Sequence, residues 1–255
     1  MGTTRALFAT IRGHLTKQQA AATFDQNAMM TQEYMAHGER VGWASHNNPV
    51  DDQKAALLLE FVTGQRLLDV GCATGTYTSL ASQLGSSVGV DANPYLLETA
   101  RNTHPHVPFV QGSILHLPFA DKSFDTTIAF DILEHVPEAQ ALEELIRVTQ
   151  KRLILCVPHT TPEVLSELFL LYGHHADITH LRTYDQQSMQ QALKAHQLTP
   201  VFLRPSHPLS TDALFLNILE GSTILKKTLR KACFAFTKPR QFYSNLIVVA
   251  DIATP

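Results

Sequence analysis

One strand–turn–helix unit constrains the fold of this chain more than any other stretch. Residues 66–70 form a short run that is apolar apart from Arg66 at its start and the carboxylate of Asp69, and small residues follow from Gly71 to Gly75. A helix is predicted over 76–84. A glycine turn between a parallel strand and a helix lets the backbone approach a ligand closely, and it directs helix N–H groups toward that ligand. The unit therefore predicts an α/β fold with a binding site at this turn.

An acidic residue ends the next predicted strand. Asp91 lies 20 residues after Gly71 and directly follows the apolar run 87–90. An acid at this position can accept hydrogen bonds from both hydroxyl groups of a ribose. Two strands, a glycine turn and this acid are the parts needed to hold a nucleoside.

The pattern around the turn resembles the class I S-adenosylmethionine-dependent methyltransferases, especially the small-molecule, methyltransferase type 11-like group. The family motif Asp-x-Gly-x-Gly-x-Gly stands here as Asp69, Gly71, Ala73 and Gly75, so alanine replaces the middle glycine. Because alanine adds only one methyl group, we expect the binding turn to be slightly narrower than in the family. The resemblance implies S-adenosyl-L-methionine as the cofactor, because Asp69 would suit its cationic methionine end and would repel the pyrophosphate of a dinucleotide.

Two later segments extend the resemblance. Residues 112–119 are similar to the Gly-Asp-Ala-x-x-Leu-Pro-Phe segment of the family, with Ser113 in place of the acid, and residues 131–137 are similar to its Leu-Glu-His-Val segment. The family implies an adenine contact by the backbone of Ile114 and by Ser113, for which a simple turn residue is the alternative. The implied cofactor-binding residues are Asp69, Gly71, Cys72, Ala73, Gly75, Asp91, Ala92, Ser113, Ile114, Phe130 and Asp131.

Polar residues after the fourth and fifth predicted strands are expected on the acceptor side of the site. Ligands in open α/β sheets bind at the carboxyl ends of the strands. His135 and His180 are the candidate catalytic bases for a hydroxyl acceptor, with a structural role as the alternative for His135. The expected substrate and lid residues are Tyr34, Glu134 and Arg182. The guanidinium of Arg182 would anchor an anionic acceptor or pair with an acid of the loop.

A histidine-rich segment raises the question of a metal. Residues 177–184 resemble the His-x-x-His-x-Arg-x-Tyr/Phe block that follows the fifth strand in the family, with Asp177 in place of its first histidine. His174, His175 and His180 could join Asp177 as ligands, but their spacing lacks the framework of a zinc site. We therefore expect polar lid residues here and no metal.

The length and charge of the chain bound the remaining possibilities. The 255 residues suit one α/β domain, and a net charge of −3 does not favour nucleic acid as a partner.

The three cysteines are far apart, so neither a disulfide framework nor a metal cluster is expected. We see no apolar core of a signal peptide and no run long enough to span a membrane, so a cytoplasmic location is expected. The oligomeric state stays open.

A Rossmann-like sheet of seven mostly parallel strands is predicted, with helices on both faces. Strands over 198–204 and 245–252 are expected to form its antiparallel end.

The chain divides into two expected parts. Residues 1–62 are assigned to an N-terminal helical cap, and residues 63–255 to the methyltransferase core. Within the core we expect a lid loop over 159–185 and a helical insertion over 205–243. The basic and apolar residues of 224–240 are compatible with a peripheral membrane contact, a lid or a dimer surface. The simplest interpretation is a helix whose apolar side is buried and whose lysines are solvated.

The predicted function is that of an enzyme, a methyltransferase that acts by direct displacement on a small-molecule acceptor. Lipid-, quinone- and sugar-linked acceptors all stay open. One alternative is a nicotinamide-dependent oxidoreductase on a similar fold, and another is a non-catalytic S-adenosylmethionine-binding regulator.

Overall fold

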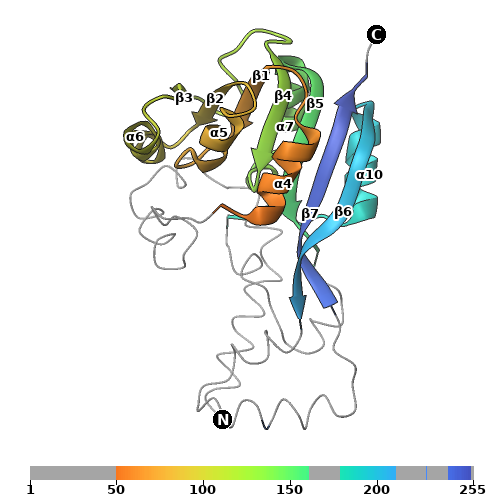
Figure 1. Cartoon of the computed structure of the whole chain (residues 1–255). Coiled ribbons are helices and arrows are strands. Elements are labelled where there is room, and N and C mark those ends of the chain that lie inside the picture. Colours follow the sequence, from red (N-terminus) through yellow and green to blue (C-terminus); the bar gives the residue numbers. More distant parts are fainter. Residues whose placement is uncertain (1–49, 161–178, 211–227, 229–240, 254–255) are drawn as a thin grey trace, which may run out of the picture.

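A single sheet organises the part of the chain that the structure describes. The computed structural model describes residues 50–160, 179–210, 228 and 241–253 (Figure 1). The seven strands lie in the order β3-β2-β1-β4-β5-β7-β6. Strands β1 to β5 pair in parallel, whereas β7 runs antiparallel to both β5 and β6. The predicted Rossmann-like fold is therefore confirmed, including its antiparallel end.

The elements alternate along the chain as a doubly wound fold requires. The strands are β1 (Arg66–Val70), β2 (Ser86–Asp91), β3 (Phe109–Gln111), β4 (Phe124–Phe130), β5 (Thr149–Pro158), β6 (Leu198–Ser210) and β7 (Gln241–Ile252). The helices are α4 (Asp52–Phe61), α5 (Thr76–Ala81), α6 (Pro94–Thr103), the 3-10 turn η3 (Leu133–His135), α7 (Glu138–Val148) and α10 (Gln186–Ala195).

Side-chain caps fix where three of the helices begin. The Asp51 carboxylate accepts a hydrogen bond from the Lys54 N–H at 2.9 Å, which starts α4. Asn93 directly precedes the proline that opens α6, and its side chain accepts a hydrogen bond from the N–H of Tyr95 at 2.9 Å. Asp185 forms a capping box at the start of α10. The sequence offers Asp51 or Asp52 as the cap of the first of these helices and Asn93 as the cap of the second, and the structure has Asp51 and Asn93 at these positions.

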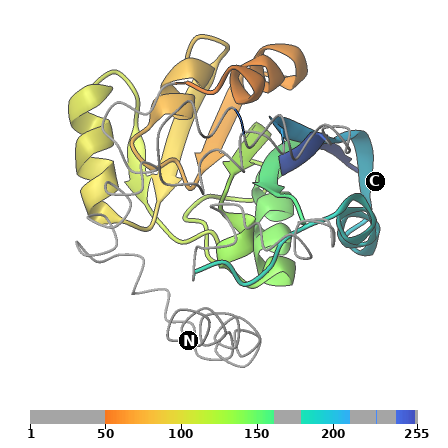
Figure 2. The same cartoon turned by 90° about the horizontal axis from the view of Figure 1, so that it is seen from below.

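Apolar layers cover both faces of the sheet. Leu142 and Leu145 of α7 pack with Leu68 and Leu155 on one face. Leu58 of α4 belongs to a second cluster on the other face, where alternate strand residues point. Figure 2 shows the helices on the two sides of the sheet. Such two-sided cover leaves the carboxyl ends of the parallel strands as the natural place for a ligand.

The last two strands are longer than predicted. The sequence predicts that the sixth strand ends at residue 204, but β6 continues to Ser210 and β7 already begins at Gln241. The part of the predicted insertion 205–243 nearest the sheet is therefore strand, which corrects its boundaries. Strand β6 accommodates Pro205 and Pro208 because, among the described strands, it lies at the sheet edge and pairs with β7 alone, where a missing N–H is tolerated.

The division between an N-terminal cap 1–62 and the core stays a prediction. Helix α4, predicted as part of the cap 1–62, packs against the sheet with Leu58 fully buried. Residues 1–49, with Tyr34, and most of 224–240 lie outside the described residues. Among the described residues no helix combines the length and apolarity needed to cross a bilayer.

Candidate active site

The turn after β1 is hydrogen-bonded to the neighbouring strand β2. The N–H groups of Gly71 and Cys72 both donate to the carbonyl of Val90, at 2.8 and 3.1 Å. The Gly75 N–H then closes the turn on the Cys72 carbonyl at 2.8 Å. Because Val90 precedes Asp91, these bonds place the turn beside the carboxyl end of β2.

Three residues of this turn have left-handed backbone. Gly71 and Gly75 have φ values of 72° and 82°, and a Cβ at either would meet Ile132 or Phe109 within 2.8 Å. Ala73 has a φ of 46°, which costs an L-residue about 1 kcal/mol or more. The substitution of the middle family glycine thus strains the backbone, in addition to the small narrowing that the sequence predicts.

Asp91 joins the turn to the start of α6. Its Oδ2 accepts from the Ala73 N–H at 2.9 Å, and its Oδ1 accepts from the Asn93 N–H at 2.8 Å. Burial raises the pKa of Asp91 above its ordinary value, against the lowering effect of these hydrogen bonds. A carboxylate has about four lone-pair sites, so each oxygen can accept a further hydrogen bond.

Asp69 lies beneath the turn. Its side chain is 3% exposed and accepts a hydrogen bond from the Thr78 hydroxyl of α5 at 2.6 Å. Burial raises its pKa to about 7, and the nearby charge of Asp91 adds to the effect. This contact braces the strand against the helix, whereas a direct contact with a methionine moiety stays a prediction.

Asp131 follows β4 and takes part in a partly buried ion pair. It has a φ of 51°, and its carboxylate accepts hydrogen bonds from Lys54 Nζ and, at 3.2 Å, from Asn245 Nδ2. Its N–H donates to the Cys156 carbonyl at 2.8 Å. Burial is the largest single effect on the pKa of Lys54 and lowers it. The charge of Asp131 and its hydrogen bond, together with effects of Cys156 and Tyr77, outweigh burial and raise that pKa above its ordinary value.

Lys54 was not predicted as a site residue, although the sequence held a signal for it. It precedes the buried Leu57 and Leu58 by three and four positions, which places it on the buried stripe of α4. Its Nζ lies 5.9 Å from the ring centre of Tyr77 and 5.6 Å from that of Phe130. The two rings contact edge to face at 5.2 Å and form an apolar wall beside the ion pair.

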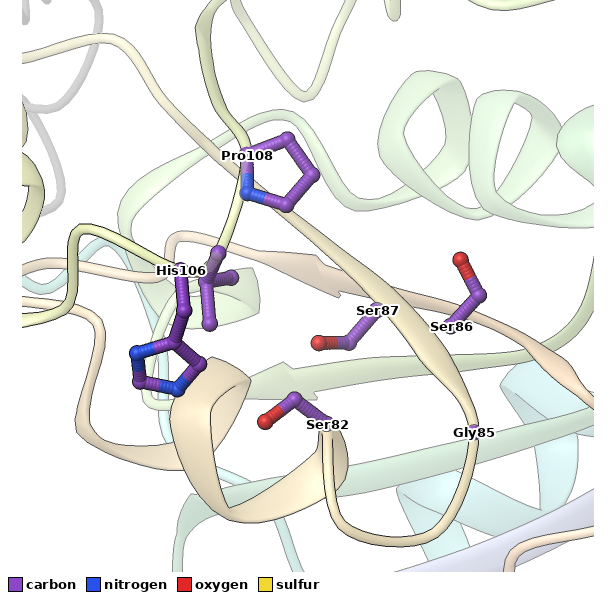
Figure 3. A pocket seen from close by; sticks show the side chains of 7 residues that line it. Ser82, Gly85, Ser86, Ser87, His106 and Pro108 are labelled. Atoms are coloured by element: carbon purple, nitrogen blue, oxygen red, sulfur yellow. The ribbon is translucent and has the colours of Figure 1, made fainter.

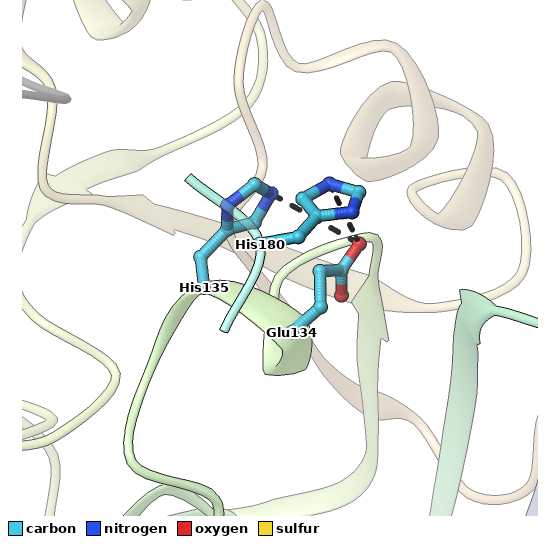
Figure 4. A group of neighbouring side chains, drawn as sticks. All are labelled: Glu134, His135 and His180. Atoms are coloured by element: carbon cyan, nitrogen blue, oxygen red, sulfur yellow. Dashed lines mark ion pairs between the residues drawn. The ribbon is translucent and has the colours of Figure 1, made fainter. Parts of the chain in front are cut away.

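Glu134, His135 and His180 converge just after β4 (Figure 4). Glu134 is fully buried, and the side chains of both histidines are 8% exposed. Glu134 Oε1 lies 3.9 Å from His135 Nε2 and 4.0 Å from His180 Nε2. The two imidazole rings lie 4.6 Å apart between centroids. The structure thus brings together both predicted catalytic histidines and one predicted substrate residue.

Backbone contacts hold η3 and the segment around His180 together. The Leu181 N–H donates to the Glu134 carbonyl at 2.8 Å. The guanidinium of Arg182 donates to the carbonyls of Leu133, at 3.1 Å, and Val136. Arg182 therefore holds η3 in place, and a contact with an anionic acceptor stays a prediction.

Known proteins are similar to this chain in sequence and in fold. Residues 68–157 match a family model described as a methyltransferase domain. Magnesium protoporphyrin IX methyltransferase from Synechocystis, solved with bound SAH, superposes with a TM-score of 0.60 at 16% identity, over 90% of this chain and 100% of its own. Residues 68–157 therefore form a methyltransferase domain, and the fold of the described core is that of class I S-adenosylmethionine-dependent methyltransferases.

Curated relatives are similar to part of this chain. Demethylmenaquinone methyltransferase from Renibacterium salmoninarum is 33% identical over 137 residues, which cover 52% of this chain and 54% of the relative. An uncharacterized methyltransferase from Mycobacterium marinum is 37% identical over 105 residues, 40% of this chain and 41% of the relative. The chain thus spans about half the length of these relatives.

The segment after β3 of the methyltransferase core forms a tight turn. The Ser113 hydroxyl accepts a hydrogen bond from the Leu115 N–H at 3.2 Å, and the backbone carbonyl of Ser113 accepts one from the His116 N–H at 2.9 Å. Ile114 is 5% exposed. The Ala92 carbonyl, after β2, accepts from Gln111 Nε2 at 3.2 Å. The turn interpretation of Ser113 matches these bonds, while adenine contacts by Ser113 and Ile114 stay predictions.

The two described cysteines are packing residues of the methyltransferase core. Cys72 and Cys156 are 6% and 0% exposed, and both are free thiols. Burial raises the pKa of both thiols well above the ordinary value, which disfavours the nucleophilic thiolate. Cys233, like His174, His175 and Asp177, lies outside the described residues.

One cavity lies at the other end of the methyltransferase sheet. It has a volume of about 250 Å³. Its lining residues are Ser82, Gly85, Ser86, Ser87, His106, Val107 and Pro108 (Figure 3). They surround the amino ends of β2 and β3, whereas Asp91 stands at the carboxyl end of β2. The cavity is therefore separate from the site at the carboxyl ends.

Proposed function

We propose that this chain transfers the methyl group of S-adenosyl-L-methionine to a small-molecule acceptor. The observation that carries the proposal is the Asp91 carboxylate, which is bonded to the left-handed turn after β1 at 2.9 Å. An acid at the end of β2 beside a glycine turn at the end of β1 suits a nucleoside with an extended tail. The family membership of residues 68–157 supports the same cofactor.

The residues present fit this cofactor. The remaining lone pairs of Asp91 suit the ribose hydroxyls, and the lack of a side chain at Gly71 and Gly75 lets the methionine end approach the backbone. Ser113 and Ile114 would border the adenine. Phe130 and Asp131, at the carboxyl end of β4, would border the methionine moiety or the acceptor.

Methyl transfer by this chain would need alignment and one proton acceptor. An acceptor oxygen forms a bond to the methyl carbon while the carbon–sulfur bond breaks, and its electrons stay on the departing thioether. Alignment alone supplies about 7–11 kcal/mol in favourable cases. The hydroxyl proton has to leave, and the buried cluster of Glu134, His135 and His180 lies at the carboxyl end of β4 to receive it.

A quinone-type acceptor is the class that we favour. The support is the printed name of a relative, demethylmenaquinone methyltransferase from Renibacterium salmoninarum, which is 33% identical over 137 residues. The reduced form of a quinone carries ring hydroxyls and an electron-rich ring carbon, and either can attack a sulfonium methyl group.

Two measurements on the full chain test the proposal. Isothermal titration with S-adenosylhomocysteine and with NAD should show binding of the first only. Asp91→Ala should raise the dissociation constant of S-adenosylhomocysteine at least about tenfold, the factor for a lost interaction of about 1.4 kcal/mol. The matched control Asp121→Ala removes an acid whose side chain is 75% exposed and should leave it unchanged.

Three outcomes would overturn parts of the proposal. Binding of NAD would favour the oxidoreductase. Unchanged affinity in Asp91→Ala would refute the ribose assignment. Tight binding without transfer of labelled methyl to reduced quinones or other hydroxylated acceptors would favour the non-catalytic regulator.

A further inference from the structure

Glu134, His135 and His180 have the geometry of three ligands around one ion. Their donor atoms all lie within 4.8 Å of one another. The two histidine Nε2 atoms stand 3.9 and 4.0 Å from Glu134 Oε1, which is too far for a direct hydrogen bond. Metal–nitrogen and metal–oxygen bonds are each about 2.0–2.2 Å long, so two ligand atoms on one tetrahedral ion lie about 3.3–3.6 Å apart. The observed separations are longer than this by roughly 0.5 Å, so the side chains would close slightly around a bound ion.

The surroundings also suit a cation. Glu134 is fully buried at 0% exposure, and burying a carboxylate is unfavourable unless positive charge lies close to it. Two imidazoles and one carboxylate form a donor set preferred by divalent transition metals, whereas magnesium and calcium prefer all-oxygen sites. Three protein ligands leave coordination positions open, as in catalytic zinc sites.

A neighbouring residue orients one of the histidines. The Thr179 hydroxyl and His135 Nδ1 are hydrogen-bonded at 2.9 Å. This bond directs the other ring nitrogen, Nε2, toward Glu134 Oε1. Metal-ligating histidines almost always bond an oxygen through their second ring nitrogen in this way.

We propose that Glu134, His135 and His180 together bind one divalent transition-metal ion of the zinc or manganese class. The ion would lie beside the carboxyl end of β4, on the acceptor side of the site. There it would lower the pKa of a coordinated acceptor hydroxyl, whose proton would pass to solvent water. With the ion bound, water would replace the cluster as the proton acceptor, and the histidines would act as ligands and not as bases. Metal binding itself does not depend on the proposed methyl transfer, and the two can fail separately.

The sequence did not point to this set. His180 was grouped with His174, His175 and Asp177, its neighbours in the chain, and that spacing argued against a metal. The fold instead brings His180 to Glu134 and His135, which precede it by more than 40 residues. Only the contact between η3 and the segment 179–182 creates the cluster.

Cobalt and zinc titrations of the full chain test the proposal directly. The protein is purified without a polyhistidine tag and stripped with a chelator, and Co²⁺ is added while visible absorption is recorded. One equivalent should produce d–d bands, and zinc should displace it. His180→Ala and Glu134→Gln should raise the dissociation constant by more than the roughly 10–100-fold cost of losing an outer-shell partner.

Matched variants separate this site from other histidines. His196→Ala, at the end of α10, and the double variant His174→Ala with His175→Ala should bind the ion as the unmodified chain does. Thr179→Val should weaken binding by about 10–100-fold, because it removes the partner that orients His135. A thermal melt of each variant, with and without zinc, separates loss of the site from loss of the fold.

Each contrary result counts against the site. Absence of a stoichiometric cobalt complex would overturn the proposal, as would unchanged affinity in His180→Ala. Loss of binding in the His174 and His175 double variant would move the ion to the neighbouring segment. Metal binding without methyl transfer would leave this site in place and refute the proposed function alone.

Discussion

Lys54 of α4 and Asp131 after β4 form an ion pair although 77 residues separate them in the chain. The Lys54 side chain is 12% exposed, and Asp131 is 34% exposed. The pair connects the first described helix to the carboxyl end of the central strand. It therefore fixes one wall of the proposed site through a residue outside the recognised motifs.

Removing one partner of this pair should destabilise the protein more than removing both. Lys54→Met keeps the length and apolar contacts of the side chain but leaves Asp131 without its ammonium partner. We expect a loss of about 1–3 kcal/mol of unfolding free energy, because Asp131 is partly exposed and the full cost of a broken buried pair does not apply. Urea unfolding at pH 7 measures it.

A double-mutant cycle with Asp131→Asn isolates the coupling between the two charges. The double variant should recover part of the loss, with a coupling energy of about 1 kcal/mol or more. Additive effects of the two single substitutions would show that the pair is energetically unimportant. In the methyl-transfer assay, Lys54→Met should reduce turnover, since Asp131 borders the transfer site in our proposal.

The part of the fold that local chemistry encodes could be predicted from the sequence. The glycine turn needs Gly71 and Gly75 for their left-handed backbone, and Asn93 before a proline announces a helix start. Pairing across long separations could not be predicted in this way. Pro205 and Pro208 mark a strand end unless the strand is known to be the sheet edge, which only the assembled fold reveals.

The site shows the same division. Asp91 and the turn were recognisable because they lie on adjacent strands at a familiar spacing. The proximity of Glu134 and His180 could not be recognised from the sequence, because it depends on where the segment after β5 packs against η3. The burial of Asp69 against Thr78 also depends on packing, which decides whether a carboxylate faces a ligand or braces the sheet.

Asp69 should make the folded protein less stable as the pH rises. Burial raises its folded-state pKa from an ordinary value of 3.8 to about 7. Between those values the folded state holds a proton that the unfolded state has lost, so unfolding free energy falls with increasing pH. The maximum slope is about 1.4 kcal/mol per pH unit. Above pH 7 the loss is complete.

Asp69→Asn should remove this dependence while keeping an acceptor for the Thr78 hydroxyl. Its stability relative to the unmodified chain should rise between pH 4 and pH 7, which is the window of the raised pKa, and then become constant. Urea unfolding at several pH values in that window measures the difference. Parallel stability curves for the two proteins would show that Asp69 titrates as an ordinary carboxyl group.

Asp125 should produce the opposite pH dependence. Its carboxylate accepts hydrogen bonds from the Arg66 side chain and from the N–H groups of Gln65 and Arg66, and these hold its pKa well below the ordinary value. The depressed pKa contributes stability that is present above about pH 4 and is lost as the pH falls below it.

Asp125→Asn should therefore cost about 1–3 kcal/mol at pH 7 and less at pH 3. Acid unfolding followed by circular dichroism compares the two proteins. A constant difference across that range would contradict the role of the ionised carboxylate. The exposed Asp121 serves as the control, since Asp121→Asn should change stability by less than about 0.5 kcal/mol at either pH.

Ala73→Gly should stabilise the protein, which is unusual for a substitution to glycine. Ala73 has a φ of 46°, and this conformation costs an L-residue about 1–2 kcal/mol. Glycine avoids that cost but loses about 0.5–1 kcal/mol of backbone entropy on folding, so a net gain of about 0.5–1 kcal/mol is expected. Because Ala73 is exposed, its methyl group contributes little packing.

The buried Ala81 of α5 gives the matched comparison. Ala81→Gly places glycine in an ordinary helix and removes a methyl group at 0% exposure, so it should destabilise the protein by about 1 kcal/mol or more. Guanidinium unfolding of both variants measures the contrast. A loss of stability in Ala73→Gly would mean that the turn is not strained. A gain accompanied by tighter S-adenosylhomocysteine binding would show that the strain also opposes cofactor binding at the proposed site.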